Sequence, residues 1–104
     1  MNICVYGASS SAIDKSYILD GEKLGELLAQ RGHTLVFGGG NHGLMGAAAR
    51  GAKKGGAKII GVTPSFFNVD GILYPECDEL LRTETMRERK QLMEDLSDAF
   101  IMTP

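Results

Sequence analysis

The chain has 104 residues, which suits one domain, and we expect residues 1–104 to form it. Charged residues make up 23% of the sequence and the net charge is −2, so charge gives no case for a nucleic-acid or membrane partner. The two cysteines have no metal-ligand spacing, and neither a signal peptide nor a bilayer-spanning segment is evident, so we expect a cytoplasmic protein without a metal.

The first third of the chain predicts a strand followed by a helix. The apolar run NICVY, residues 2–6, predicts a buried strand that stops at Gly7. The following helix is expected to run to about Gln30, where Gly32 ends it. Its inner face is expected to contain residues spaced three or four apart: Tyr17, Gly21, Leu24 and Leu28.

A second strand–helix unit and a third strand follow. The run HTLVFGGG, residues 33–40, predicts a strand that ends in three glycines. Small residues from about Gly43 to Lys54 predict a helix that can pack closely, and two glycines end it. The run AKIIGVT, residues 57–63, predicts the third strand.

The last third is expected to contain a loop, two short strands and one helix. Residues 65–78 form mostly loop, and ELLRTE, residues 79–84, predicts a short strand. A helix over residues 86–96 is indicated by Thr85 as N-cap with Glu88 three residues later. Its apolar side is expected to hold Met86, Met93 and Leu96, and DAFIMT predicts a final strand.

Strands that alternate with helices predict an α/β fold, a Rossmann-like parallel sheet with helices on both faces. In such folds ligands bind at the carboxyl ends of the strands. Gly38, Gly39 and Gly40 lie at such an end, where the absence of side chains lets a ligand approach the main chain. The helix that begins near Gly43 offers free N–H groups to an anion.

A second loop of small residues, with the hydroxyl groups of Ser9 and Ser10, follows the first strand. The two loops together indicate a nucleotide or sugar-phosphate site. The competing interpretation is a tight turn that only packs a helix on the sheet. The spacing matches neither the dinucleotide-binding fingerprint nor the phosphate-binding P-loop, which argues against nicotinamide cofactors and ATP.

The stretch TMRERKQLMEDL places Arg87, Arg89 and Lys90 at the start of a helix, where cations are unfavourable. A local conflict of this kind often marks a functional site. Arg89 can bind a phosphate or carboxylate through its forked guanidinium, and we expect it to face a pocket rather than the core. The alternative is a solvated basic turn balanced by neighbouring glutamates.

Two stretches carry a resemblance to a known family. GGGNHGLMGAAARGAKKGGAKIIGVTP and TMRERKQLMEDLSDAFIMTP, together with VYGASS in the first strand, resemble the lonely guy (LOG) family of Rossmann-like proteins over essentially the whole chain. The resemblance implies a phosphoribohydrolase that cleaves the N-glycosidic bond of a nucleoside 5′-monophosphate such as AMP. It also implies no cofactor or metal, and a homodimer.

The resemblance assigns site residues. Arg89 corresponds to the family's active-site arginine, with Lys90 beside it. The remaining substrate-binding residues would be Ser9, Ser10, Gly38, Gly39, Gly40, Gly43 and Met86.

The family's second signature, PGGxGTxxE, carries a phosphate loop and the catalytic glutamate, and Pro104 would be its first residue. We therefore expect residues 1–104 to be the N-terminal part of the fold, truncated before its last strands and helices. On its own, this part is expected to be catalytically silent and to self-associate through the open edge of its last strand.

Two other functions remain open at this point. Molybdenum-cofactor carrier proteins share this kind of fold and a glycine-rich loop, so the chain could bind a nucleotide or cofactor without cleaving it. Lysine decarboxylation is disfavoured, because it needs a Schiff-base lysine and a pyridoxal phosphate site that no motif marks.

Overall fold

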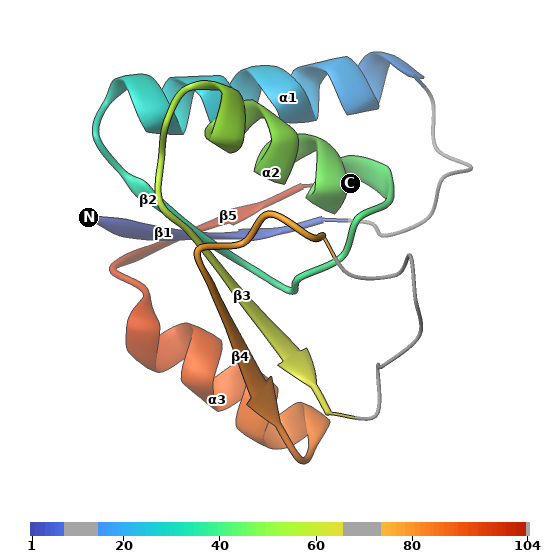
Figure 1. Cartoon of the computed structure of the whole chain (residues 1–104), viewed down its shortest axis with the longest axis vertical. Helices are drawn as coiled ribbons and strands as arrows, with labels where there is room; N and C mark the ends of the chain where they lie inside the picture. Colours follow the sequence, from blue (N-terminus) through green and yellow to red (C-terminus); the bar gives the residue numbers. More distant parts are fainter. Residues whose placement is uncertain (8–14, 66–73, 104) are drawn as a thin grey trace.

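A computed structural model describes residues 1–7, 15–65 and 74–103 (Figure 1). Five parallel strands form one sheet with the order β4-β3-β2-β1-β5. Helices α1 and α2 cover one face of this sheet, and α3 covers the other (Figure 1). The elements are β1 (Asn2–Tyr6), α1 (Lys15–Gln30), β2 (Thr34–Phe37), α2 (Gly43–Lys54), β3 (Ile59–Pro64), β4 (Glu79–Thr83), α3 (Met86–Leu96) and β5 (Ala99–Met102). The predicted α/β fold with helices on both faces is confirmed.

The order of the strands reverses at β1. From β1 the chain adds β2, β3 and β4 on one side, and α3 then carries it back across the other face to β5. Cys4 in the middle of β1 therefore pairs with Val36 of β2 on one side and with Phe100 of β5 on the other. Ligands of open parallel sheets bind at the carboxyl ends of strands where the order reverses, and here this point lies at the ends of β1 and β5.

Each face of the sheet packs its own apolar core. On the α1 and α2 face, Val5, Phe37 and Ile59 are fully buried with the alanines of α2. On the α3 face, Cys4 and Val62 pack with Met93 of α3. Because side chains alternate along a strand, the consecutive apolar residues in β1, β2 and β3 serve both cores at once.

The predicted helix ends are confirmed by backbone geometry. Gly32 has a φ of 73°, and the amide of His33 donates to the carbonyl of Leu28 at 2.9 Å, the hydrogen bond that closes a Schellman motif after α1. At the start of α3, Thr85 Oγ1 accepts a hydrogen bond from the amide of Glu88 at 3.1 Å. This is the N-cap that the sequence predicted.

Two side chains expected on inner helix faces are exposed instead. Tyr17 lies near the start of α1, and its side chain is in contact with solvent, as is that of Met86 in the first turn of α3. Both lie in the first turns of their helices, which follow the carboxyl ends of β1 and β4 in the chain. Periodicity gave the correct face, but it does not show how much of a first turn is covered. Among the described residues, no helix combines the length and apolar character needed to cross a membrane.

Close packing of α1 on α2 depends on glycine. A Cβ atom added at Gly51 would overlap the backbone carbonyl of Glu22, and one at Gly25 would overlap the carbonyl of Ala48. The helix backbones therefore touch directly at these two positions, whereas the small residues of α2 predicted close packing on the sheet.

We expect Gly51→Ala to lower the free energy of unfolding by about 1–3 kcal/mol, because the methyl group forces the two helices apart. Helix propensity alone predicts the opposite sign, a gain of about 1 kcal/mol. Urea unfolding of the wild type and the variant distinguishes the two, and Lys23→Ala, at an exposed position of α1, serves as the control. A more stable Gly51→Ala variant would contradict the close contact.

Candidate functional site

The guanidinium of Arg89 links α3 to the ends of two strands. Its Nε donates a hydrogen bond to the carbonyl of Val62 in β3 at 2.9 Å, and Nη2 donates to the carbonyl of Gly38, just after β2, at 3.0 Å. The side chain thus reaches from α3 to Gly38, the first of the three glycines, which is 51 residues away in sequence. The two stretches that the sequence singled out meet at this contact.

Arg89 is half-buried, and its charge lacks a carboxylate partner among the described residues. Burial lowers the pKa of the guanidinium, and the neighbouring side chains that oppose this shift are Tyr6 and Cys4. Arginine nevertheless stays charged at neutral pH. Two of its five N–H groups bind these carbonyls, and the other three have no hydrogen-bond acceptor among the described residues. Among the described residues its hydrogen-bond partners are both carbonyls, and a half-buried cation in such a setting favours an anionic ligand.

The glycine loop needs glycine for two reasons: Arg89 lies against it, and part of its backbone has a positive φ. A Cβ atom at Gly38 would collide with the Arg89 guanidinium, so a side chain here would displace it. Gly39 has a φ of 81°, a left-handed conformation that glycine adopts readily, and its carbonyl accepts a hydrogen bond from the amide of Tyr74 at 2.8 Å. Gly43 has a φ of 66° and begins α2.

The N-terminus of α2 has no side-chain cap from its N-cap residue. His42 occupies the N-cap position without a side-chain hydrogen bond to the helix, and the first turn contains no acidic residue. Met45 of this turn lies over the glycine loop, where its sulfur is 3.4 Å from the amide of Gly40. The positive end of the helix dipole and Arg89 therefore approach the same edge of the sheet.

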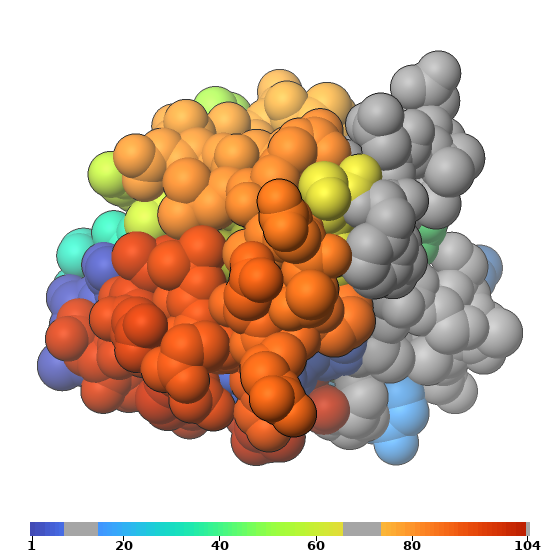
Figure 2. Space-filling view, turned by 90° about the horizontal axis from the view of Figure 1, so that it is seen from below, coloured from blue at the N-terminus to red at the C-terminus, as the bar shows by residue number. Residues whose placement is uncertain are grey.

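A hollow of about 220 Å³ lies between these elements at the ends of β1 and β2. Its lining comes from both strands, α2 and α3: Val5, Tyr6, Gly7, Gly38, Met45, Arg89 and Met93. A second hollow of about 300 Å³ shares Tyr6 and Arg89 with it and extends along α3 to Met86 and Lys90. Figure 2 looks at the face that α3 covers. Together the hollows could hold a polar head next to Arg89 and an apolar group along α3.

The structure brings together part of the predicted site. Gly38 and Arg89 line the first hollow, and Met86 and Lys90 line the second. Neither hollow is lined by the other three predicted glycines, Gly39, Gly40 and Gly43, which belong to the loop between β2 and α2 and to the start of α2. The remaining two predicted residues, Ser9 and Ser10, lie outside the described residues.

Sequence reasoning missed Tyr6, which lines both hollows. In the sequence, Tyr6 looks like one more apolar residue of a buried strand. Only its position at the carboxyl end of β1 could have indicated that it belongs to the site. Thr103 was missed for the same reason: its hydroxyl donates to the Tyr6 carbonyl at 2.6 Å and joins the ends of β1 and β5. Among the described residues, no cluster of three His, Cys, Asp or Glu side chains could hold a metal ion.

Burial raises the pKa of Tyr6 to about 12, helped by the nearby Cys4 and Glu94, while Arg89 opposes the shift. The pKa of Tyr74 is also raised to about 12, by burial and by its hydrogen bond to Glu76. We expect two tyrosines to ionise near pH 12 in an absorbance titration. The folded state holds these protons more tightly than the unfolded state does. The full free energy of unfolding is therefore present below the unfolded pKa of about 10, and it declines from there to about pH 12.

The variant Tyr6→Phe should remove one of these two late-titrating groups from the absorbance titration. If the titration of the wild type showed Tyr6 ionising near its ordinary pKa, the burial of its phenol would be contradicted.

Comparisons with known proteins add family information to this geometry. A model described as the SLOG cluster4 family matches residues 1–104. The chain is 43% identical over 102 residues to the cytokinin riboside 5′-monophosphate phosphoribohydrolase of Mycobacterium tuberculosis, a match that covers 98% of this chain and 54% of that protein. The protein of Oryza sativa subsp. japonica named cytokinin riboside 5′-monophosphate phosphoribohydrolase LOG is 37% identical over 102 residues, covering 98% and 42%. The chain thus spans about half the length of the curated relatives it matches.

Solved structures agree on the fold. The molybdenum cofactor carrier protein of Chlamydomonas reinhardtii superposes with a TM-score of 0.81 at 25% identity, covering 97% of this chain and 60% of that chain. The molybdenum cofactor binding protein of Rippkaea orientalis gives a TM-score of 0.76 at 27% identity, covering 97% and 59%. These likenesses confirm the predicted Rossmann-like architecture.

Proposed function

The chain belongs to the SLOG cluster4 family, the lonely guy (LOG) family that its motifs resemble, and on that premise we propose that it forms the nucleotide-binding part of a phosphoribohydrolase. The substrate would be a nucleoside 5′-monophosphate such as AMP, and the products the free base and ribose 5-phosphate. Two relatives that match nearly the whole chain are named for this activity toward cytokinin riboside 5′-monophosphate.

One observation carries the proposal: the hydrogen bond between Arg89 Nη2 and the carbonyl of Gly38. It places a half-buried cation, without a carboxylate partner among the described residues, beside a glycine loop and the N-terminus of α2, which His42 does not cap with its side chain. These three features suit a phosphorylated ribose, whose phosphate is a dianion. The free N–H groups of Arg89 would bind the phosphate or a ribose hydroxyl.

In the proposed reaction the bond between ribose C1′ and the base nitrogen breaks, and its electron pair leaves with the base. A water oxygen bonds to C1′, and one water proton is transferred to the base. The ribose passes through an oxocarbenium-like cation, which a nearby carboxylate stabilises. By resemblance, the family's glutamate for this role belongs to the PGGxGTxxE signature, so residues 1–104 would supply binding and positioning.

Arg89 is the proposed catalytic residue. Proposed substrate-binding residues are Ser9, Ser10, Gly38, Gly39, Gly40, Gly43, Met86 and Lys90. The hollows support Gly38, Met86 and Lys90 in this role, because these residues line them together with Arg89. The proposal also includes a cytoplasmic location and a homodimer, and sedimentation of the purified protein tests the latter.

A chimaera tests the activity. Residues 1–104 would replace the residues they match in the M. tuberculosis relative, so that the unmatched half of that protein completes the fold. We expect the chimaera to release adenine and ribose 5-phosphate from AMP, detected by chromatography. A folded chimaera that binds AMP without releasing adenine would reject the hydrolase proposal and leave a binding protein, as in the molybdenum cofactor carriers.

A further inference from the structure

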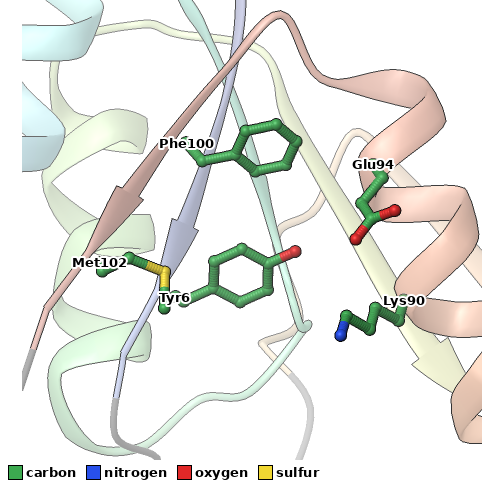
Figure 3. Close-up of a pocket in the computed structure, with 5 residues that line it drawn as sticks. All are labelled: Tyr6, Lys90, Glu94, Phe100 and Met102. Carbon is green, nitrogen blue, oxygen red and sulfur yellow. The ribbon is translucent and has the colours of Figure 1, made fainter.

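Two tyrosine rings lie near the glycine loop, on opposite faces of the sheet. Tyr6 lies on the α3 face, where Figure 3 shows its ring beside Phe100 and its hydroxyl pointing toward α3. Tyr74 lies on the other face, in the core beneath α1 and α2, and is only 5% exposed. Tyr6 lines the candidate site directly, whereas Tyr74 contacts the backbone of the glycine loop.

Residues 74–78 run from the glycine loop to the start of β3. At one end, the amide of Tyr74 donates a hydrogen bond to the carbonyl of Gly39 at 2.8 Å. At the other end, the amide of Asp78 donates to the carbonyl of Ile59 at 2.9 Å, and the Asp78 carboxylate accepts a hydrogen bond from the Ile59 amide at 2.7 Å. The segment is therefore fixed to the glycine loop and to β3 at the same time.

The side chain of Tyr74 keeps its amide in place. Its ring lies edge-on to the ring of Phe37, the last residue of β2, with the centroids 6.2 Å apart. Its hydroxyl donates to Glu76 Oε2 at 3.2 Å, and its carbonyl accepts a hydrogen bond from Cys77 Sγ at 3.6 Å. Because Phe37 directly precedes the three glycines, the ring anchors Tyr74 to the strand from which the loop begins.

The hydrogen bond from Tyr74 fixes the orientation of the peptide between Gly39 and Gly40. In a planar trans peptide the C=O and N–H point in opposite directions, so the Gly40 N–H points away from Tyr74. Its partner is the sulfur of Met45 at 3.4 Å, and a thioether is a weak acceptor. Met45 also lines the hollow that contains Arg89, and its side chain is flexible. A ligand oxygen that displaces this side chain gains the Gly40 N–H.

We propose that Tyr74 is a positioning residue of the candidate site, which holds the glycine loop so that the Gly40 N–H binds a phosphate oxygen of the substrate. This inference rests on the proposed nucleotide site. The phosphate oxygen would take the place of the Met45 sulfur, because a charged oxygen accepts a stronger hydrogen bond than a thioether does. Tyr74 touches no part of the substrate and acts through the loop.

The alternative is that Tyr74 only fills the core. It packs in the same apolar cluster as Leu28, which is also 5% exposed. Leu28 lies near the end of α1, shortly before the start of β2, and thus at the opposite end of this strand from the glycine loop. If Tyr74 only fills space, Tyr74→Ala and Leu28→Ala should have the same kind of effect, because both remove side-chain volume from one core.

Amide hydrogen exchange of the 104-residue chain tests the positioning without measuring activity. In Tyr74→Ala, the protection factor of the residue-74 amide should fall about tenfold relative to that of the Leu35 amide, which donates to the Lys58 carbonyl at 3.0 Å. The Gly40 amide resonance should shift as well. Leu28→Ala is the matched control: it should lower the Tm by several degrees, as Tyr74→Ala does, and leave this ratio unchanged.

Kinetics of the chimaera test the consequence for the substrate. Tyr74→Ala should raise the KM for AMP on the order of tenfold, with a smaller change in kcat, because a phosphate contact is made in the ground state and in the transition state alike. Tyr74→Phe keeps the ring and the amide, so its KM should stay close to that of the wild type. Leu28→Ala should leave the KM unchanged.

An active chimaera in which Tyr74→Ala leaves the KM unchanged, or in which Leu28→Ala raises it equally, would overturn this inference and leave the hydrolase proposal intact. If the chimaera binds AMP without cleaving it, the Kd for AMP replaces the KM with the same expectations. A chimaera without affinity for AMP would reject the nucleotide site and this inference together.

Should Tyr74→Ala fail to fold, Tyr74→Leu, which keeps an apolar side chain in the core, takes its place in both measurements. An unchanged protection ratio in the substituted chain would show that Tyr74 only fills the core.

Discussion

Replacing Arg89 with alanine in the chimaera is expected to reduce adenine release from AMP by at least about 100-fold, the scale seen when one preorganised donor is lost from an active site. The guanidinium hydrogen-bonds to the glycine loop, and among the described residues three of its N–H groups have no acceptor and its charge has no carboxylate partner. Steady-state kinetics with AMP measure the loss.

The same substitution should also affect stability, more than a surface residue would. Arg89→Ala leaves the carbonyls of Val62 and Gly38 without their hydrogen bonds, which costs about 1–3 kcal/mol when the carbonyls stay buried. Arg89→Lys separates the two roles, because lysine keeps the charge but cannot reproduce the fork. We expect it to fold and to remain strongly impaired. Unchanged turnover in a folded Arg89→Ala chimaera would remove this residue from the site.

Gly38→Ala is expected to impair the chimaera nearly as much as Arg89→Ala, although the added group is one methyl. That methyl would overlap the guanidinium of Arg89 and force it away from the loop. A displacement of about 1 Å at a positioning group can reduce the rate on the order of 100-fold. Gly38 does not have a positive φ, so alanine is compatible with the backbone, and the expected loss arises from the displaced arginine.

Gly40→Ala provides the matched control for this substitution. A Cβ atom at Gly40 would approach the flexible Met45 side chain at 3.1 Å, and Gly40 likewise lacks a positive φ. Because the methyl group meets the end of a flexible side chain and not Arg89, we expect this variant to lose less activity than Gly38→Ala. In the Arg89→Ala background, Gly38→Ala should cost little more, because the group it displaces is already absent. Additive losses would show that Gly38 acts by another route, for example by direct contact with the substrate.

Most of the fold could be predicted from the sequence because the signals were local. Glycines with positive φ at positions 32 and 56 end α1 and α2 where predicted, and Thr85 caps α3 where predicted. The alternation of strands and helices sufficed for the parallel sheet. The exposure of Tyr17 and Met86 could not be predicted, because periodicity gives the inner face of a helix but not how much of its first turn is covered.

The site was harder to predict because it depends on contacts between distant segments. The composition of the glycine loop and the positive charge of Arg89 at a helix N-terminus both indicated a functional site. However, no sequence pattern shows that Arg89 reaches the carbonyls of Val62 and Gly38. Tyr6 was missed because an aromatic residue in an apolar strand also suits a core. Phe100 follows the same pattern, and its exposure results from the outer position of β5.

Titration of the 104-residue chain with AMP, followed by ¹⁵N NMR, tests the central claim most directly, because NMR detects even weak binding. We predict shifts of the Arg89 Nε–H and of the amides of residues 38–46, while the exposed Leu19 and Leu27 of α1 stay unchanged. Arg89→Ala should abolish the shifts in the glycine loop. Unshifted Arg89 and loop resonances at millimolar AMP, or shifts confined to the opposite end of the sheet, would contradict a nucleotide site at this edge.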